Sequence, residues 1–408
     1  MKQFNVPLTY RSRLISAIKN KRRSEDKLKK DFSPTFLDFG PLQIYLARHF
    51  GFCYGVENAI EISFKTVEEN KGKRIFLLSE MIHNPLVNDD LKKRGVEFLM
   101  DTNGNSLIGF DTLNANDIVI IPAFGTTLKI ENQLKEIGIQ IEKYNTTCPF
   151  VEKVWNRAEA IAAKNYTIVI HGKPRHEETR ATFSHSAYNA PTVVVNDINE
   201  TIELGKYITG EKDFEDFYSE FEGQYSTGFN IEKDLERIGV VNQTTMLASD
   251  TQSIAEYLKE IIKKKYNLSE ENIIQRFADT RDTLCYATYE NQTAVKALLQ
   301  VDADLAIVVG GYNSSNTSHL VELCEEKLPT YFIDSSDKLI EKDKILHYNF
   351  HSKMNVETID FLPQKIPLKI LITSGASCPD AMVEAVVNQL TSFYEIAQTA
   401  EELIASFA

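Results

Sequence analysis

The chain is poor in cysteine, with five among its 408 residues, and no two of them form a Cys-x-x-Cys pair. Five scattered cysteines are too few for a disulfide scaffold, so we expect a reducing compartment. The chain also lacks any apolar run of about 18 residues or more, which argues against a transmembrane helix. Positive charge is not in excess, since the formal net charge is −13. This balance argues against a nucleic-acid surface and against binding to an anionic membrane.

The chain does contain the apolar material of an ordinary globular protein. Hydrophobic residues make up 43% and charged residues 25% of the sequence, which are typical globular values. A length of 408 residues is too large for one small core and predicts two or three domains. An anionic ligand would have to be held by local donors, because the net charge of the chain does not attract it.

The N-terminal segment differs from the rest in charge. Its first 24 residues contain no Asp or Glu but several Lys and Arg, including Lys21, Arg22 and Arg23. An organelle transit peptide has such a composition, but acidic residues follow at once and serines are few. We expect a basic surface helix or a flexible arm, and a cytoplasmic protein. A plastid location is the alternative if residues 1–30 act as a transit peptide.

Short strand-like runs alternate with segments of helical periodicity, which is typical of α/β folds. Continuous apolar runs such as 118–121 and 306–309 indicate parallel strands that are buried on both faces. Helices are predicted between the strands, for example at 151–163 and 253–264. The predicted strands are 43–48, 74–79, 117–123, 139–144, 167–171, 192–196, 238–242, 273–277, 305–309, 330–334 and 369–373.

The strands fall into three groups, each with one lone cysteine at its edge. This grouping predicts three similar α/β lobes around a shared centre. Residues 206–234 interrupt the rhythm, because they are acidic, aromatic and rich in turn-forming residues. We expect an insertion here, more readily a solvated loop or a short extra helix pair than a docking element.

Three cysteines stand at predicted strand-to-helix junctions: Cys53, Cys148 and Cys285. Gaps of 95 and 137 residues separate them, so only the tertiary fold could bring them together. Open α/β sheets bind ligands at the carboxyl ends of their strands. Three converging thiolates would hold an iron–sulfur cluster and leave one iron open. A single cysteine is more often a small buried hydrophobe, as we expect for Cys324, and Cys378 is a weak rival fourth ligand.

Two further segments, 309–317 and 373–377, end a predicted strand and open a helix. Their hydroxyl and amide side chains, with the free backbone N–H groups of a helix start, suit phosphate oxygens. The same residue types are also ordinary helix N-caps. Neither segment matches the Walker A pattern, which makes an ATP site less favourable.

Candidate acid–base groups follow other strands. Residues 171–179 contain two histidines, two carboxylates and two cationic side chains, among them His176 and Glu178. A His-x-Glu pair near a redox centre is a plausible proton donor. His83 follows another strand, although a single histidine there is usually an ordinary loop residue. Residues 243–245 add hydroxyl groups, including Thr244, that could relay a proton or cap a helix.

From about residue 42 to residue 389, these segments together resemble the LytB-type family of 4-hydroxy-3-methylbut-2-enyl diphosphate reductases. The resemblance rests on many short motifs in the family's order. They are Gly-Phe-Cys-x-Gly-Val at 51–56, His-Asn-Pro at 83–85, Thr-Cys-Pro at 147–149, His-x-Glu at 176–178, Gln-Thr-Thr at 243–245, Cys-Tyr-Ala-Thr at 285–288, Asn-Ser-Ser-Asn at 313–316 and Gly-Ala-Ser-x-Pro-Asp at 375–380.

The resemblance implies a trefoil of three α/β lobes with mainly parallel sheets around a central [4Fe–4S] cluster. Cys53, Cys148 and Cys285 match the family's cluster ligands. Glu178 matches its acid–base glutamate, and Thr244 matches the threonine that helps to orient the substrate hydroxyl. The family's diphosphate-binding residues match five positions of this chain, and Ser315 lies beside them in sequence. The five are His83, His176, Ser314, Asn316 and Ser377.

The implied reaction is reductive removal of the hydroxyl of the allylic diphosphate to give isopentenyl and dimethylallyl diphosphate. The implied electron donor is ferredoxin or flavodoxin, with no nucleic-acid or membrane partner. We expect a basic extension at 1–41 and a first strand with the Cys53 loop at 42–54, packed with the third lobe. The lobes are predicted at 55–148, 149–283 and 284–393, with a tail at 394–408.

One departure from the family pattern concerns Phe124. Many members have a histidine in this Ala-His-Gly loop, whereas a phenylalanine ring cannot donate to a phosphate oxygen. We expect the contact to be lost, or replaced by Thr126 or Thr127. The Pro-Ala-Phe-Gly sequence at 122–125 and the insertion at 206–234 indicate the longer branch that includes cyanobacterial and plastid enzymes.

Other classes of protein stay open at this point. A redox-neutral iron–sulfur hydro-lyase also needs an open iron but no electron donor. An electron carrier or sensor needs no diphosphate loops and usually has a fully ligated cluster. A phosphosugar enzyme without a cluster is the third alternative.

Overall fold

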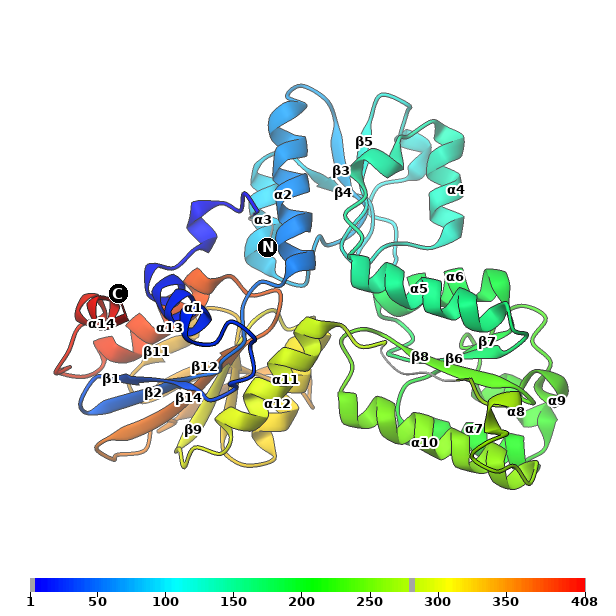
Figure 1. Cartoon of the computed structure of the whole chain (residues 1–408). Coiled ribbons are helices and arrows are strands. Elements are labelled where there is room, and N and C mark those ends of the chain that lie inside the picture. The colour runs from blue at the N-terminus through cyan, green and yellow to red at the C-terminus, as the bar shows by residue number, and fades with distance from the viewer. Residues whose placement is uncertain (1–3, 279–282, 408) are drawn as a thin grey trace. The chain divides into compact units, whose positions relative to one another are not determined.

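The computed structural model describes residues 4–278 and 283–407. The chain divides into two compact units, and the first of them combines segments that are distant in sequence (Figure 1). Unit 1 contains Met1–Glu61, Ile82–Asp89 and Tyr286–Ala408. Unit 2 contains Ile62–Met81 and Asp90–Cys285. The cysteines at the three predicted junctions are therefore divided, with Cys53 in unit 1 and the other two in unit 2.

Unit 1 is built on a five-stranded sheet in the order β1-β2-β14-β9-β10. Only β1 runs antiparallel to its neighbour. The strands are β1 (Thr35–Asp38), β2 (Leu42–Leu46), β9 (Leu305–Val309), β10 (Thr330–Ile333) and β14 (Leu368–Ser374). Because β2, β14 and β9 are adjacent and parallel, the segments that follow them leave from the same edge of the sheet. That edge carries the Cys53 loop and both predicted anion-binding segments.

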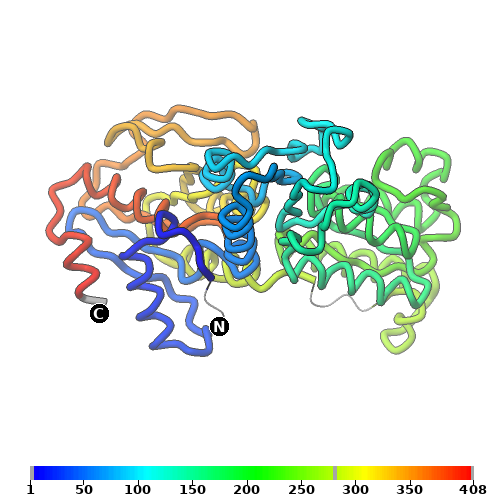
Figure 2. Tube along the Cα trace, turned by 90° about the horizontal axis from the view of Figure 1, so that it is seen from above, coloured from blue at the N-terminus to red at the C-terminus, as the bar shows by residue number. Residues whose placement is uncertain are grey.

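The helices of unit 1 flank this sheet, and the first and last described helices pack together. Helix α1 (Arg13–Glu25) contacts α13 (Asp380–Ser392) and α14 (Ala400–Phe407), so the blue and red ends of the trace lie in one unit (Figure 2). The Ser12 hydroxyl caps α1 by accepting from the Ile15 N–H at 2.8 Å. The N-terminal segment thus forms the basic surface helix that its sequence predicts. Other elements are η1 (Leu8–Tyr10), α11 (Tyr286–Leu298), α12 (Ser315–Glu325), η5 (Ser336–Lys338) and the antiparallel sheet β11 (Leu339–Glu341), β12 (Lys344–Asn349) and β13 (Met354–Ile359).

Unit 2 contains two three-stranded parallel sheets, in the orders β4-β3-β5 and β7-β6-β8. The strands are β3 (Ile75–Leu77), β4 (Glu97–Phe98), β5 (Ile118–Ile120), β6 (Thr167–His171), β7 (Thr192–Val195) and β8 (Ile238–Asn242). The helices are α4 (Leu128–Ile137), α5 (Pro149–Ala162), α6 (Glu177–Asn189), α7 (Ile198–Thr209) and α10 (Ala248–Lys265). The helices α2 (Tyr54–Glu69) and α3 (Pro85–Lys93) include residues assigned to both units.

Alternate residues of β6 face two different helical layers (Figure 1). Val169 packs with residues of α7 and α10, whereas Ile168 and Ile170 pack with α5. Burial on both faces explains why these strands are continuously apolar in sequence. The α/β class with mainly parallel sheets is confirmed. The trefoil arrangement and the predicted domain boundaries stay predictions.

The acidic insertion is better packed than a solvated loop. It contributes α8 (Phe214–Glu220) and α9 (Ile231–Asp234), which form the short extra helix pair that was the other expectation. Phe217 is fully buried and Phe221 is 2% exposed, in the same apolar cluster as α7 and α10. The aromatic residues of this segment therefore extend the core of unit 2.

Two predicted strands are wrong. Residues 139–144 and 273–277 form the single 3-10 turns η3 (Ile141–Tyr144) and η4 (Ile273–Gln275). Ile139, Ile141, Tyr144, Ile273 and Phe277 are buried, whereas Ile274 is exposed. Only isolated bridges are seen nearby, between Asn145 and Ile121 and between Phe277 and Ile238. The short elements β1, β4, β11, β12 and β13 and the 3-10 turn η2 (Phe110–Thr112) were not predicted. Among the described residues, no helix has the length and apolar character required to cross a bilayer.

Candidate active site

Cys148 is the N-cap of α5 and follows the 3-10 turn η3, not a strand. Its N–H donates to the Ala123 carbonyl at 2.9 Å, and its carbonyl accepts from Val151 N at 2.9 Å. Pro149 occupies the first helical turn, where a missing N–H costs nothing. Burial raises the pKa of the Cys148 thiol to about 12, although hydrogen bonds from the Phe150 and Val151 backbone N–H groups oppose the rise. These N–H groups at a helix start suit a thiolate once a cation neutralises it.

Cys285 and Glu178 act electrostatically on Cys148 within unit 2, and both raise the pKa of its thiol. The Cys285 N–H donates to the Thr244 carbonyl at 3.4 Å, which ties this cysteine to the segment after β8. Two thiols and a carboxylate in one partly buried region repel one another when they ionise. A bound cationic group removes that penalty, so this donor set fits a metal centre.

Glu178 lies in the first turn of α6 and is 1% exposed. Its two carboxylate oxygens accept from the same residue, Thr244, which donates its backbone N–H to Oε1 at 2.5 Å and its hydroxyl to Oε2 at 3.0 Å. Thr244 itself is 4% exposed. This bidentate contact fixes the plane of the carboxylate and joins the ends of β6 and β8. The two residues predicted to act as acid–base groups are therefore in direct contact, and Thr244 caps no helix in the described part of the chain.

His176 is the N-cap of α6. Its Nδ1 accepts from the Glu178 N–H at 3.2 Å, so a neutral His176 ring carries its hydrogen on Nε2 and can donate from that atom. The Phe124 ring packs edge to face against it, with centroids 5.7 Å apart and an interplanar angle of 83°. The phenylalanine that departs from the family pattern thus contacts the imidazole of a predicted diphosphate residue.

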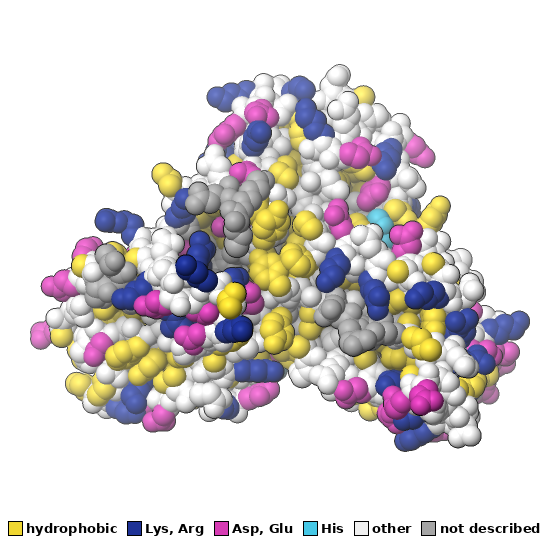
Figure 3. Space-filling model, in the orientation of Figure 1, with side chains coloured by type: hydrophobic (Ala, Val, Ile, Leu, Met, Phe, Trp, Pro, Cys, Tyr) yellow, Lys and Arg dark blue, Asp and Glu magenta, His cyan; other side chains and the backbone are white. Residues whose placement is uncertain are grey.

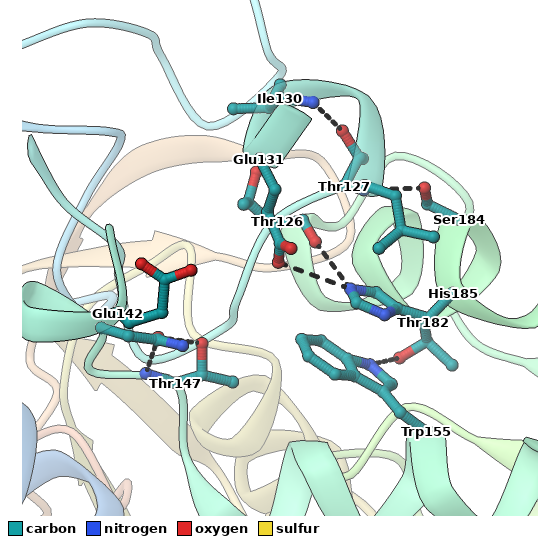
Figure 4. Close-up of polar contacts among 12 residues, drawn as sticks. Thr126, Thr127, Ile130, Glu131, Glu142, Thr147, Trp155, Thr182, Ser184 and His185 are labelled. Atoms are coloured by element: carbon teal, nitrogen blue, oxygen red, sulfur yellow. Dashed lines mark hydrogen bonds and ion pairs between the residues drawn. The ribbon is translucent and has the colours of Figure 1, made fainter. Parts of the chain in front are cut away.

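The loop that carries Phe124 is held by a neighbouring stacked pair (Figure 4). The His185 and Trp155 rings stack with centroids 3.8 Å apart, and His185 Nε2 lies 3.2 Å from the Thr126 carbonyl. Gly125 has φ +74°, and a Cβ there would lie 2.5 Å from the Trp155 ring, so this position requires glycine. The Thr127 hydroxyl caps α4 by accepting from Ile130 N at 3.4 Å. Whether Thr126 or Thr127 replaces the family histidine stays a prediction.

Cys53 lies in unit 1, between β2 and α2. Its N–H donates to the Ala376 carbonyl at 3.1 Å, and its own carbonyl accepts from the Glu57 N–H at 2.9 Å. Because Ala376 follows β14, the loops after two adjacent parallel strands are joined at Cys53. Cys53 is partly exposed, as are Cys148 and Cys285.

The predicted diphosphate residues of unit 1 gather at the same sheet edge. The Ser314 hydroxyl caps α12 by accepting from the Thr317 N–H at 3.2 Å. The Asn316 Oδ1 accepts from Ala376 N at 2.9 Å. The Ser377 hydroxyl donates to the His83 carbonyl at 3.2 Å, which places His83 beside this loop. All four side chains are less than 9% exposed.

Ser315 differs from its neighbours in hydrogen bonding. It is 4% exposed, and its hydroxyl has no hydrogen-bond partner within the described part of the chain. A buried hydroxyl without a partner costs free energy. A phosphate oxygen at the start of α12 would satisfy it.

The remaining two cysteines are buried in unit 1. Cys324 and Cys378 are both 0% exposed, and burial raises the pKa of each thiol to about 12. Cys324 lies in the core, as predicted. Among the described residues, no group of three or more His, Cys, Asp and Glu side chains is assembled as a metal site. Convergence of Cys53 with Cys148 and Cys285 therefore stays a prediction.

Comparison with known proteins identifies the family. The family described as "LytB protein" matches residues 44–391. The chain belongs to the LytB family. A relative from Picosynechococcus sp. named 4-hydroxy-3-methylbut-2-enyl diphosphate reductase is 40% identical, over 88% of this chain and 86% of its own. A Prochlorococcus marinus relative of the same name is 37% identical, over 93% and 90%. The prediction of a reductase enzyme of this family is confirmed.

The fold also matches a solved structure. The E-1-hydroxy-2-methyl-but-2-enyl-4-diphosphate reductase from Plasmodium falciparum aligns with a TM-score of 0.60 and 25% identity. The alignment covers 85% of this chain and 87% of the solved one. Membership of the longer branch that the 122–125 sequence indicates stays a prediction.

Some contacts of the site were not found from sequence. The contacts of Phe124 with His176 and of His185 with Trp155 join residues far apart in the chain, and no local pattern signals them. The dual role of Thr244 as backbone and hydroxyl donor was equally hidden. The chain contains a single tryptophan, Trp155. Its rarity could have drawn attention to it, but not to its contact with the Phe124 loop.

Proposed function

We propose that this protein reduces (E)-4-hydroxy-3-methylbut-2-enyl diphosphate to isopentenyl diphosphate and dimethylallyl diphosphate. Two electrons and two protons are consumed, the C4–O bond breaks, and the oxygen leaves as water. The names of the relatives support the substrate. The observation that carries the chemistry is the buried Glu178 carboxylate, held by Thr244 in the region of unit 2 that contains Cys148 and Cys285.

Cys53, Cys148 and Cys285 are the proposed ligands of a [4Fe–4S] cluster with one open iron. When bound, the cluster supplies electrons one at a time and an iron that polarises the C4 hydroxyl as a Lewis acid. The mutual repulsion of the two thiols and the carboxylate in unit 2 supports a cationic centre there. The partial exposure of all three cysteines leaves room for a ligand.

Glu178 is the proposed proton donor to the departing hydroxyl. Thr244 fixes the carboxylate plane and can pass a proton from its own hydroxyl, which lies 3.0 Å from Oε2. A carboxylate fixed by two donors needs little reorganisation when the proton moves, which favours general acid catalysis.

The diphosphate is assigned to His83, His176, Ser314, Ser315, Asn316 and Ser377. Ser314 accepts two hydrogen bonds from Thr317, so its own hydroxyl hydrogen is left to donate. The buried Ser315 hydroxyl and the N-terminus of α12 add donors at the same place. His176 presents Nε2–H as a further donor.

The proposed physiological electron donor is ferredoxin or flavodoxin, and the proposed location is the cytoplasm, with a plastid as the alternative. No nucleic-acid or membrane partner is proposed, in agreement with the net charge of −13.

The test is anaerobic. The protein is reconstituted with iron and sulfide, and oxidation of reduced viologen is followed when the allylic diphosphate is added. We expect substrate-dependent oxidation and both five-carbon diphosphates. A brown protein that oxidises no viologen would contradict the reductase and favour a hydro-lyase or a sensor, and a colourless protein would favour a phosphosugar enzyme.

A further inference from the structure

The N-terminal extension is packed against the Cys53 loop. Lys19 of α1 donates to the Phe50 carbonyl at 3.0 Å, and its ammonium lies 4.7 Å from the centre of the Phe50 ring. The same ammonium forms a salt bridge with Asp380 at 2.7 Å. Gly51 (φ +80°) lies so close to both groups that an added Cβ would clash. The loop that leads to Cys53 is therefore fixed from outside by α1.

Aromatic contacts extend this packing to both neighbours of Cys53. The Tyr10 ring meets the Phe52 ring edge to face at 6.0 Å, and the Phe4 ring meets the Tyr54 ring at 4.9 Å. Phe4 and Tyr10 are 5% and 3% exposed. A protein that docks on the extension would thus sit against the segment that carries a proposed cluster ligand.

The extension is basic in an otherwise acidic chain. Residues 1–30 contain ten Lys and Arg but two Asp and Glu, whereas the whole chain has a net charge of −13. Arg23, Lys27 and Lys30 are exposed, and none of them forms a salt bridge within the described part of the chain. Lys and Arg side chains are visible over the α1 region in Figure 3.

An apolar side chain lies within this basic segment. Leu28 is 75% exposed, between Lys27 and Lys29, in the turn that follows α1. We call Arg23, Lys27, Leu28 and Lys30 the basic face.

The positive charge also acts on the loop itself. His49 lies four residues before Cys53, and its pKa is lowered to about 4 by burial and by Arg48, Lys29 and Lys19. The Glu290 carboxylate lies 3.5 Å from His49 Nδ1. Burial is the main cause of this shift, and Arg48, Lys29 and Lys19 add to it from the residues around the Cys53 loop.

We propose that the basic face is the docking surface for an acidic one-electron carrier protein. The inference rests on the proposed function, because it concerns how electrons reach the cluster. Electron transfer weakens steeply with distance, so the carrier must bind beside a cluster ligand, and the extension packs on that loop. Redox encounters use small interfaces, and charge complementarity raises their association rates.

The test compares two electron sources in the reconstituted full-length protein. Reduced viologen is a small molecule that needs no docking surface, whereas a reduced plant-type [2Fe–2S] ferredoxin is an acidic carrier. The variant is Arg23→Glu with Lys27→Glu and Lys30→Glu. The matched control makes the same charge change at exposed lysines of unit 2, namely Lys164→Glu, Lys233→Glu and Lys264→Glu.

We expect the basic-face variant to lose about tenfold or more in kcat/KM for the carrier and to keep the viologen rate of the wild type. The control should lose much less with the carrier. Raising the ionic strength from about 0.01 M to about 0.15 M should weaken carrier kinetics of the wild type more than those of the variant. Equal carrier kinetics in wild type and variant, or equal losses in the variant and the control, would overturn the proposal.

Binding of the oxidised carrier, measured by calorimetry, separates this inference from the proposed function. If the wild type binds the carrier but has no reductase activity, and the variant does not bind it, the docking surface is supported and the proposed reductase function is rejected. Wild-type protein that binds vesicles of anionic phospholipid through the basic face, and does not bind the carrier, would show a membrane surface and overturn the proposal.

Discussion

The two units both contain parallel sheets, but they bring their polar side chains together in different ways. Unit 1 collects Cys53, Ser314, Asn316 and Ser377 at one edge of one sheet, where neighbouring loops share backbone hydrogen bonds. Unit 2 takes its groups from two sheets, with Cys148 tied to Ala123 after β5 and Glu178 tied to Thr244 after β8.

The difference lies in what the polar groups do. In unit 1 they are mainly hydroxyls and amides at helix starts, which favour an anion. In unit 2 they are two thiols and a carboxylate, which favour a cation and a proton. We propose that unit 1 mainly holds the diphosphate and that unit 2 mainly supplies acid–base chemistry, with one proposed cluster ligand in unit 1 and two in unit 2.

The largest expected effect is the loss of turnover when a proposed cysteine ligand is replaced in either unit. Cys53→Ser in unit 1 and Cys148→Ser in unit 2 should each abolish viologen-coupled turnover, because each removes a proposed thiolate ligand. The visible iron–sulfur absorbance after reconstitution should be lost or strongly changed. Cys324→Ser is the control, since Cys324 is fully buried in the core, and should leave cluster absorbance and turnover intact. Full activity in either ligand variant would contradict the assignment.

The next largest effect concerns the proton donor of unit 2. Glu178→Gln keeps the shape of the side chain but removes its acid function, so kcat should fall by roughly two orders of magnitude or more while the cluster spectrum is unchanged. Thr244→Val keeps the backbone donor and loses the hydroxyl donor, so its kcat should fall less. Thr244→Ser keeps a hydroxyl donor and should retain most of the wild-type kcat. Near-normal turnover of Glu178→Gln would remove the carboxylate from the mechanism.

A smaller effect, on KM, should come from the hydroxyls of unit 1. Ser315→Ala removes a buried hydroxyl that lacks a partner in the described residues, so KM should rise about tenfold, as loss of a hydrogen bond to a charged group predicts. Ser314→Ala should also lower the free energy of unfolding by about 1 kcal/mol, because it removes the α12 cap. Steady-state kinetics measure the KM, and denaturant unfolding measures the free energy of unfolding. A fall in kcat with unchanged KM in Ser315→Ala would argue against the division.

The last effect, which is absent at neutral pH, is the pH dependence of stability that His49 introduces in unit 1. Its pKa is about 4 in the folded protein and about 6.5 when unfolded, so the unfolded state binds the proton more tightly. Stability should therefore be complete above pH 6.5 and decrease as the pH falls toward 4, by at most about 1.4 kcal/mol per pH unit. Unfolding of the apoprotein, compared between wild type and His49→Gln, measures this. Parallel pH profiles would show that His49 does not contribute.

Much of the fold could be predicted because the central strands are continuously apolar. Residues 167–171, 238–242 and 305–309 were predicted with the boundaries that β6, β8 and β9 have. Residues 139–144 and 273–277 were wrongly predicted as strands, because a partly buried 3-10 turn can have the same apolar content as a strand. The elements β4 and β11–β13 are short or half exposed, and their sequence patterns are weak for that reason.

The site could be predicted in residue identity but not in contact. The His-x-Glu and Gln-Thr-Thr motifs indicated Glu178 and Thr244, yet their pairing depends on β6 and β8 being neighbours. The hydroxyl of Ser314 was ambiguous between capping and ligand binding, and the structure shows that it caps α12. The packing of residues 4–19 on the Cys53 loop could not be seen in the sequence, because it depends on aromatic contacts across the fold.

Unit 1 is formed from segments at both ends of the chain, and this affects the order in which the two units can fold during translation. Strand β2 pairs with β14 more than 320 residues later, so its sheet cannot close until most of the protein has left the ribosome. Unit 2 is drawn from residues 62–285 and can fold earlier. We expect nascent chains that end near residue 285 to protect unit 2, but not the Cys53 loop, from brief proteolysis. Iron and sulfide would then be inserted late, after the last strand has emerged.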